Sequence, residues 1–119
     1  MDKVNIRDKF ALFDAYWTPK ILGEVNNSYV KIFKAKGEFV WHSHENEDEF
    51  FLVIKGQLCI KLRGKEIVLN EGEFFIVPKG IEHMPYAKEE AHVLLFEPKE
   101  VVNTGSTVSE KTVENPEWI

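Results

Sequence analysis

The chain has 119 residues, the size of a single domain, and its 44% hydrophobic and 29% charged residues are typical of a folded globular protein. The net charge of −5, with no basic run, argues against a nucleic-acid partner, whose phosphates need a basic face. The single Cys59 excludes an internal disulfide, and we find neither an apolar leader nor a stretch of membrane-spanning length, so we expect a cytoplasmic protein without a membrane partner.

Residues 1–18 carry a helical pattern. Apolar side chains recur at spacings of four, three and four, at Ile6, Phe10, Phe13 and Trp17. Asn5 stands where a helix cap is expected, and Thr18 precedes a proline, which favours a helix end. We interpret residues 1–18 as an N-terminal helical segment that covers part of a sheet or of a neighbouring subunit.

Residues 19–98 are predicted to be all strand. Short runs rich in Val, Ile and Phe alternate with turn signals, among them Asn26-Asn27, Lys36-Gly37, Lys55-Gly56, Arg63-Gly64, Asn70 to Gly72 and Pro78 to Gly80. This spacing is typical of a β-sandwich or barrel. The run from Glu49 to Ile54 is apolar on both faces after its first residue, so we expect one face to line the interior and the other to meet the N-terminal helix or a second subunit.

Residues 99–119 are predicted to form a polar C-terminal tail. Its sequence is rich in Asn, Thr, Ser and Glu, but it ends in Trp118-Ile119. These two apolar residues indicate that the end of the tail docks on the domain, although chain ends are usually mobile.

Three histidines and one glutamate occur at spacings that would bring their side chains together at one metal site. If Phe39 to His44 is a strand, His42 and His44 share one face, about 6.5 Å apart along the chain. A hairpin loop of residues 45–48 would place Glu49 opposite His44, at about 5 Å. His83 follows the next proline-glycine turn. Each residue alone is typical of an ordinary surface or core position, but three imidazoles and one carboxylate together suit a divalent first-row metal.

Two segments in this order resemble the two motifs of the cupin family. The first runs from Gly37 through His42-Ser43-His44 and, after four residues, Glu49, followed six residues later by Gly56. The second runs from Gly72, five residues, Pro78-Lys79-Gly80, two residues and His83. The resemblance covers about residues 30–97 and implies a double-stranded β-helix barrel with a metal held by His42, His44, Glu49 and His83. It also implies a homodimer, since cupins commonly dimerise.

The sequence departs from the family pattern at two positions. Four residues separate Gly37 from His42 where the pattern has five, which moves the turn and leaves the ligands in register. Ala87 stands where the pattern has Asn, at a position outside the metal ligands.

Candidate pocket residues follow from strand alternation. Phe51 and Val53 share the face of Glu49 and are expected to point inward with it. His92 begins the run to Phe96 and either lines the barrel, as a base or a ligand contact, or lies on its outer face. The pattern leaves both positions open.

The predicted centre indicates two classes of function. A divalent ion (Fe, Mn, Zn or Ni) with open positions suits a metal-dependent isomerase, lyase or dioxygenase that acts on a small oxygen-bearing molecule. The alternative is a non-catalytic, metal-dependent binding or sensor protein. No residue of the sequence identifies a catalytic acid or base, and the fold does not choose the reaction.

Overall fold

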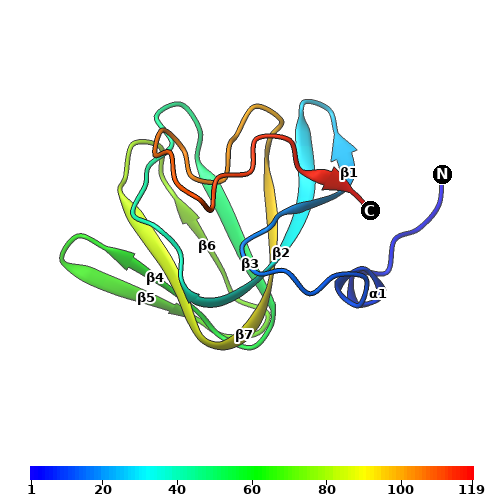
Figure 1. The fold of residues 1–119 in the computed structure, drawn as a ribbon, viewed down its shortest axis with the longest axis horizontal. Helices are drawn as coiled ribbons and strands as arrows, with labels where there is room; N and C mark the ends of the chain where they lie inside the picture. The colour runs from blue at the N-terminus through cyan, green and yellow to red at the C-terminus, as the bar shows by residue number, and fades with distance from the viewer.

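The computed structural model describes all residues, Met1–Ile119, and almost every regular element is a strand. The chain runs through α1 (Ile6–Phe10), β1 (Lys20–Val25), β2 (Ser28–Glu38), β3 (Glu49–Lys55), β4 (Leu58–Leu62), β5 (Lys65–Leu69), β6 (Phe74–Val77), β7 (His83–Pro98) and β8 (Glu117–Trp118). In Figure 1 the strands curve around a common interior, and α1 lies at one side of it. This confirms the predicted all-β barrel with a short N-terminal helix. The chain forms no helix that is long and apolar enough to cross a membrane.

The long strand β7 closes the barrel. It spans 16 residues and pairs antiparallel with β2 along most of its length. On its other edge, its first residues pair with β4 (Leu62↔His83) and its later residues pair with β3 (Phe50↔Phe96). Because β7 carries two different neighbours in succession, it links β4 to β3. Its first residue, His83, lies beside Glu49, the first residue of β3.

A contiguous hydrophobic core fills this interior. Fourteen buried residues form one cluster, with contributions from β2, β3, β4 and β7. Along β3, Phe51 and Val53 are buried, whereas Phe50 and Leu52 on the opposite face are half-buried. The inner face of the strand is therefore buried, whereas its outer face is only partly covered within the chain.

The helix is shorter than the apolar pattern predicts. It ends at Phe10, although the Asn5 side chain caps it as expected, accepting a hydrogen bond from the Asp8 N–H at 3.0 Å. Trp17 has a left-handed backbone with φ of 57°, and its N–H donates to the Lys34 carbonyl at 2.8 Å, so this segment follows β2 instead. The Trp17 ring packs in the core 4.9 Å from the Phe39 ring, centroid to centroid. Burial of this large ring outweighs the weak propensity of a short helix.

The predicted turn at Lys36-Gly37 is wrong. Strand β2 continues to Glu38, and its pairing with β7 shifts register between Ala35 and Gly37. Gly37 has φ of 76°, which a bulge within a strand accommodates as readily as a turn does.

The C-terminal tail crosses one end of the barrel. In Figure 1 its orange and red segment runs across the top of the barrel. Val101 and Thr104 are buried there, and β8 pairs in parallel with β1 through Ile21↔Trp118. The tail is thus packed on the domain, and β8 attaches its apolar end to β1.

Candidate metal centre

The four predicted ligands come together at this end of the barrel. His42 and His44 lie between β2 and β3, Glu49 begins β3 and His83 begins β7. One ligand atom from each of the four lies within 4.8 Å of all the others, and every one of these residues is buried. The structure therefore contains a group that could bind a metal ion.

The backbone reaches this arrangement by a different route from the predicted hairpin. Residues 39–44 do not form a strand paired with β3. Instead His42 and His83 exchange two backbone hydrogen bonds, at 3.0 and 2.9 Å, and the Gly80 N–H donates to the His44 carbonyl at 2.7 Å. Strand β3 is already paired with β6 and β7, so no edge is left for a hairpin partner. The expected closeness still holds, because His44 Nε2 lies 3.3 Å from Glu49 Oε1.

Backbone carbonyls set the orientation of two imidazoles. His42 Nδ1 lies 2.9 Å from the Val40 carbonyl oxygen, and His83 Nδ1 lies 3.0 Å from that of Ile81. Since a carbonyl only accepts, each Nδ1 carries the proton and each Nε2 keeps a lone pair when the ring is neutral. Both Nε2 atoms face Glu49 Oε1, at 4.0 and 2.9 Å. Metal-ligating histidines commonly have this arrangement.

The electrostatics of the group favour a cation. His44 Nε2 is buried and has no hydrogen-bond partner, although such atoms are normally satisfied. Three imidazole nitrogens thus surround a buried carboxylate that needs positive charge nearby. The donor set of three imidazoles and one carboxylate fits a divalent first-row metal ion.

Protonation also suits ligation. Burial, followed by the charge of His83, lowers the pKa of His42 to about 4, so this ring is neutral at neutral pH. Burial alone would raise the pKa of Glu49, but His44 and His83, whose Nε2 atoms lie 3.3 and 2.9 Å from its Oε1, outweigh it and hold that pKa well below its ordinary value. The carboxylate is therefore ionised, as a ligand must be.

A narrow cavity lies beside His42 and Glu49. The space between its wall atoms, counted together with open solvent at its mouth, is about 310 Å³, and only about 20 Å³ is open to the centre of a water molecule. Its other walls are Trp17, Pro19, Phe33, Phe39, Phe51, Pro85, Leu95 and Asn103. No lysine or arginine lines it, so the cavity is mainly apolar and aromatic.

The predicted pocket residues lie in three different places. Phe51 lines the cavity, whereas Val53 is fully buried in the hydrophobic core and is not among the cavity walls. His92 lies on the outer face of β7, where its ring stacks on Phe10 at 4.3 Å and its Nε2 lies 2.8 Å from Glu90 Oε2. Strand alternation explains this, because it is Ala91, Val93 and Leu95 that point into the core.

Sequence reasoning missed a buried lysine–glutamate pair next to the ligands. Lys31 and Glu97 are each only 2% exposed, and Lys31 Nζ lies 3.4 Å from Glu97 Oε1, while Glu97 Oε2 has no hydrogen-bond partner. Burial, together with the charge of Glu49, raises the pKa of Glu97 to about 8. The signal was present in the sequence, because Glu97 continues the inward alternation of Val93 and Leu95.

The tail also reaches the centre. A Cβ added at Gly105 would lie 2.0 Å from the Ser43 carbonyl oxygen and 3.5 Å from His44 Nδ1, so the tail backbone lies directly against this loop. Thr107 Oγ1 donates to the Trp41 carbonyl at 3.3 Å, and Asn103 is a wall of the cavity. The tail therefore closes the end of the barrel next to the four ligands.

Comparison with known proteins gives a consistent result. The cupin domain family matches residues 29–97. A solved cupin-2 domain protein from Shewanella frigidimarina is 45% identical, with a TM-score of 0.80 over 81% of this chain and 94% of that one. The uncharacterized protein YdbB of Bacillus subtilis is 38% identical over 80 residues, which are 66% of this chain and 65% of YdbB.

A more distant relative is an enzyme. The 3-hydroxyanthranilate 3,4-dioxygenase of Nematostella vectensis is 36% identical over 61 residues, which are 48% of this chain and 22% of that protein. The match thus spans about a fifth of the dioxygenase and just under two thirds of YdbB.

Proposed function

This chain belongs to the cupin family, and on that premise we propose that it is a metal-dependent enzyme acting on a small oxygen-bearing organic molecule. His42, His44, Glu49 and His83 hold one divalent transition metal ion, which is Fe, Mn, Zn or Ni. The reaction is of the isomerase, lyase or dioxygenase type.

The observation that carries this proposal is the position of the ligands beside a cavity. Four protein ligands would close a tetrahedral zinc site, but they leave up to two positions open on a six-coordinate ion such as Fe or Mn. The cavity adjoins two of the ligands, His42 and Glu49, so a small molecule in it lies next to the centre. When bound, the ion polarises a substrate oxygen as a Lewis acid or, if it is iron, supports oxygen chemistry.

The residues that line the cavity favour a particular class of substrate. Trp17, Phe39 and Phe51 offer flat apolar surfaces that exclude water and pack against a planar or partly apolar molecule. Asn103 also lines the cavity, but its amide is engaged within the tail, because Nδ2 donates to the Lys111 carbonyl at 2.9 Å and Oδ1 accepts from the Val113 N–H at 2.8 Å. Because no cationic side chain lines the cavity, we expect a carbonyl, carboxylate or vicinal oxygens rather than a phosphate.

The dioxygenase relative supports one of the three reaction types. Its 36% identity extends over 61 residues, about half of this chain. We therefore rank oxygen chemistry first when the bound metal is iron, and we treat its substrate as a starting point for the ligand screen.

The narrow cavity favours a second candidate, a non-catalytic binding or sensor protein. With room for about one water molecule, the closed barrel admits a substrate only if the walls or the tail move. A binding protein needs no turnover and is compatible with such slow exchange.

The decisive experiment combines metal analysis with a ligand screen. Elemental analysis of the purified protein should give about one divalent ion per chain, because the four ligands form a single group. Aromatic and aliphatic molecules that carry carbonyl, carboxylate or vicinal hydroxyl groups are then screened by thermal shift on metal-loaded and metal-stripped protein. Ligands that stabilise only the loaded form, and are consumed by it, support the enzyme.

Other results would change this assignment. Ligands that stabilise the loaded form but are not converted, with or without dioxygen, would favour the binding protein. Equal stabilisation of both forms would show that the metal is not the anchor, and a protein that retains no divalent ion would contradict both candidates.

A further inference from the structure

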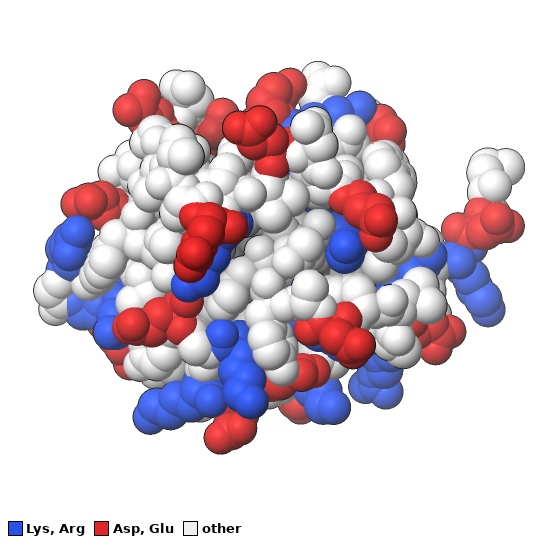
Figure 2. Space-filling model, viewed as in Figure 1, with Lys and Arg blue, Asp and Glu red and all other residues white.

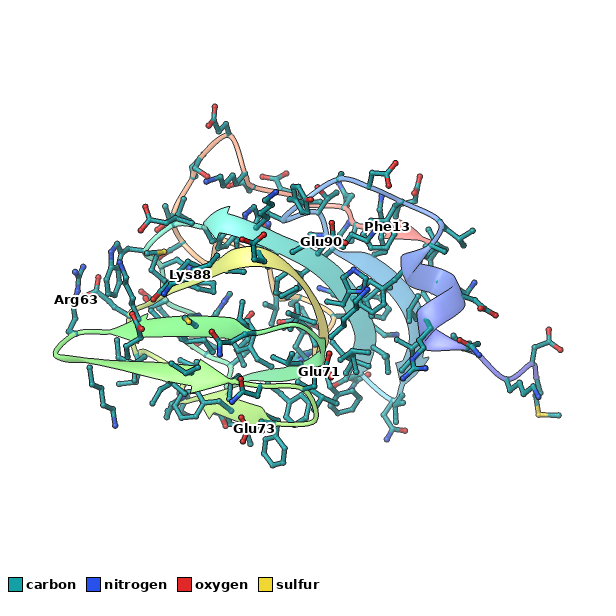
Figure 3. All side chains as sticks on the ribbon, turned by 90° about the horizontal axis from the view of Figure 1, so that it is seen from below. Phe13, Arg63, Glu71, Glu73, Lys88 and Glu90 are labelled. Atoms are coloured by element: carbon teal, nitrogen blue, oxygen red, sulfur yellow. The ribbon has the colours of Figure 1, made fainter.

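A second cleft lies outside the barrel, between α1 and the outer face of β2, β7 and β3. It is much roomier than the internal cavity, with about 500 Å³ open to the centres of water molecules. Its walls come from Arg7 and Phe10 of α1 and from outward-facing strand residues. Figure 3 views this side from below and shows Glu71 and Glu90 on the part of the barrel that faces α1.

Basic side chains form a row across the three strands of the cleft. In the sheet register Lys34 of β2 is the direct partner of His92 of β7, and His92 is in turn the partner of Lys55 of β3. All three line the cleft, and Arg7 adds a guanidinium from the opposite wall. The charges of Lys34, Lys55 and Arg7 therefore face one cleft, and like charges repel unless negative charge neutralises them.

The acidic groups nearby neutralise only part of this charge. Glu90 pairs with His92 at 2.8 Å and with Lys34 at 4.0 Å, and it also accepts from the Tyr16 hydroxyl at 2.9 Å. Glu71 lines the cleft, but one of its oxygens already accepts the Gly56 N–H at 3.1 Å.

Two cations of the cleft have no partner. Arg7 and Lys55 form no ion pair, although the chain has 20 acidic residues against 15 basic ones. In Figure 2 basic side chains, with acidic ones among them, lie along the lower edge of the molecule, on the side that Figure 3 presents.

The remaining walls suit a ligand with an apolar part. Phe10, Ala11 and Ile54 contribute apolar surface beside the basic row. Lys34, in the middle of the cleft, is only 7% exposed, and its ammonium donates to the Phe13 carbonyl at 2.6 Å, which holds it in place and leaves it poorly hydrated. Charge-assisted hydrogen bonds are strongest in such a partly buried setting.

We propose that this cleft binds a small organic dianion, a phosphate monoester or a dicarboxylate, whose charged end lies between Arg7, Lys55 and Lys34 and whose apolar part contacts Phe10 and Ile54. The planar guanidinium of Arg7 presents paired N–H donors, which match two oxygens of either anion. The site is separate from the metal centre and does not depend on the function proposed for it.

The test uses metal-stripped full-length protein, so that no anion can bind to a metal ion in the barrel. Phenyl phosphate and phthalate, which share a ring but differ in their charged groups, are titrated at constant ionic strength set with chloride. Amide chemical shifts of Arg7, Ala11, Ile54 and Lys55 should change saturably. Saturation with phenyl phosphate alone assigns a phosphate monoester, and saturation with phthalate alone assigns a dicarboxylate.

The variants make the assignment specific. The double substitution Arg7→Gln and Lys55→Gln should weaken binding by about tenfold or more, because two charge-assisted contacts are lost. Lys88→Gln removes one exposed charge of β7, on the side of the molecule away from α1 in Figure 3, and should leave the affinity unchanged. Shifts that never saturate with either anion, or equal affinity in the double variant, would overturn the proposal. Both residues of the double variant are exposed, so its spectrum should remain that of the folded protein.

Discussion

The chemistry of the candidate centre depends on how single side chains are turned. Carbonyls at Val40 and Ile81 fix the protonated nitrogens of His42 and His83, so the opposite nitrogens are directed toward Glu49 without any help from a bound ion. His44 differs, because its Nε2 lacks a hydrogen-bond partner while buried. A buried polar atom without a hydrogen bond lowers the stability of the folded protein by about 1–3 kcal/mol, and a bound cation would remove this penalty. The ligands are thus held ready before a metal arrives.

Loss of one ligand should separate metal binding from folding. His44→Ala should weaken the proposed metal binding by about 100-fold or more, since loss of even an outer hydrogen-bond partner of a ligand costs 10–100-fold. It should lower the stability of the metal-free protein less than a core truncation does, because the barrel is held mainly by apolar packing. Metal content by elemental analysis and unfolding in denaturant measure the two effects.

Phe51→Ala is the matched core substitution. Phe51 is 2% exposed, so its truncation should lower the free energy of unfolding by about 3–5 kcal/mol while all four ligands remain. If His44→Ala protein retained a full equivalent of metal, the assignment of His44 as a ligand would be wrong.

The buried Glu97 predicts a specific dependence of stability on pH. Burial raises its pKa from 4.5 to about 8 in the folded protein. Between these values the folded state holds a proton that the unfolded state has released, so this residue makes the free energy of unfolding fall as pH rises from about 4.5 to about 8. Its slope is at most about 1.4 kcal/mol per pH unit. Denaturant unfolding of metal-free protein across this range measures it.

Glu97→Gln should remove this contribution, because the amide resembles the protonated carboxyl and does not titrate. The informative quantity is the difference between the two pH profiles, since the titration of groups remote from Glu97 cancels in it. Glu89→Gln, at an exposed position of the same strand, is the control and should leave the profile unchanged. Parallel profiles for the wild type and Glu97→Gln would show that Glu97 is ionised throughout.

At the scale of elements, strand parity predicted more than helix periodicity did. The double-faced apolar run of β3 and the turn before His83 could be read from the sequence, because alternation and proline-glycine turns are local signals. The N-terminal pattern predicted too long a helix. Phe10 and Trp17 are both buried, but Phe10 ends the helix and Trp17 has a left-handed backbone outside it. No local signal shows that residues 99–113 close the barrel, since their contacts with Ser43 and Trp41 are distant in sequence.

The closing segment can be tested at a single glycine. Gly105 has φ of 58°, and a Cβ there would meet the Ser43 carbonyl carbon and oxygen at 2.9 and 2.0 Å. Gly105→Ala should therefore lift the tail from the His44 loop and speed both amide hydrogen exchange in residues 99–113 and exchange of the bound metal with a chelator. Hydrogen-exchange mass spectrometry and chelator kinetics follow the two changes.

Gly64→Ala provides the control for backbone strain alone. Gly64 also has a left-handed backbone, with φ of 89°, but no atom lies within 4 Å of an added Cβ. It should cost about 1–2 kcal/mol of stability and leave the tail in place. Equal exchange in both variants would mean that the tail does not control access to the centre.

At the scale of the whole molecule, an apolar strip remains on the outer face of the barrel. Ile76 of β6 and Phe96 of β7 are the register partners of Phe50 on either side, and the Phe74 ring stacks on that of Phe50 at 5.1 Å. Phe74, Ile76 and Phe96 are 59%, 47% and 41% exposed. Neighbouring exposed side chains of this size are typical of an interface, whereas scattered ones are ordinary.

This strip is the surface on which we expect the predicted homodimer to form. A two-fold axis would place the strip of one protomer against the same strip of its partner, which satisfies both copies at once. Phe74→Glu should then lower the association constant by several hundredfold or more, because it inserts two buried charges into each dimer. Sedimentation equilibrium over a wide range of concentration should give twice 13.8 kDa for the wild type and a shift toward 13.8 kDa for the variant.

Val68→Glu, at a 47% exposed position of β5 outside the strip, should leave the mass unchanged. A wild-type mass of 13.8 kDa at every concentration would contradict the dimer and leave the strip as free surface of a monomer.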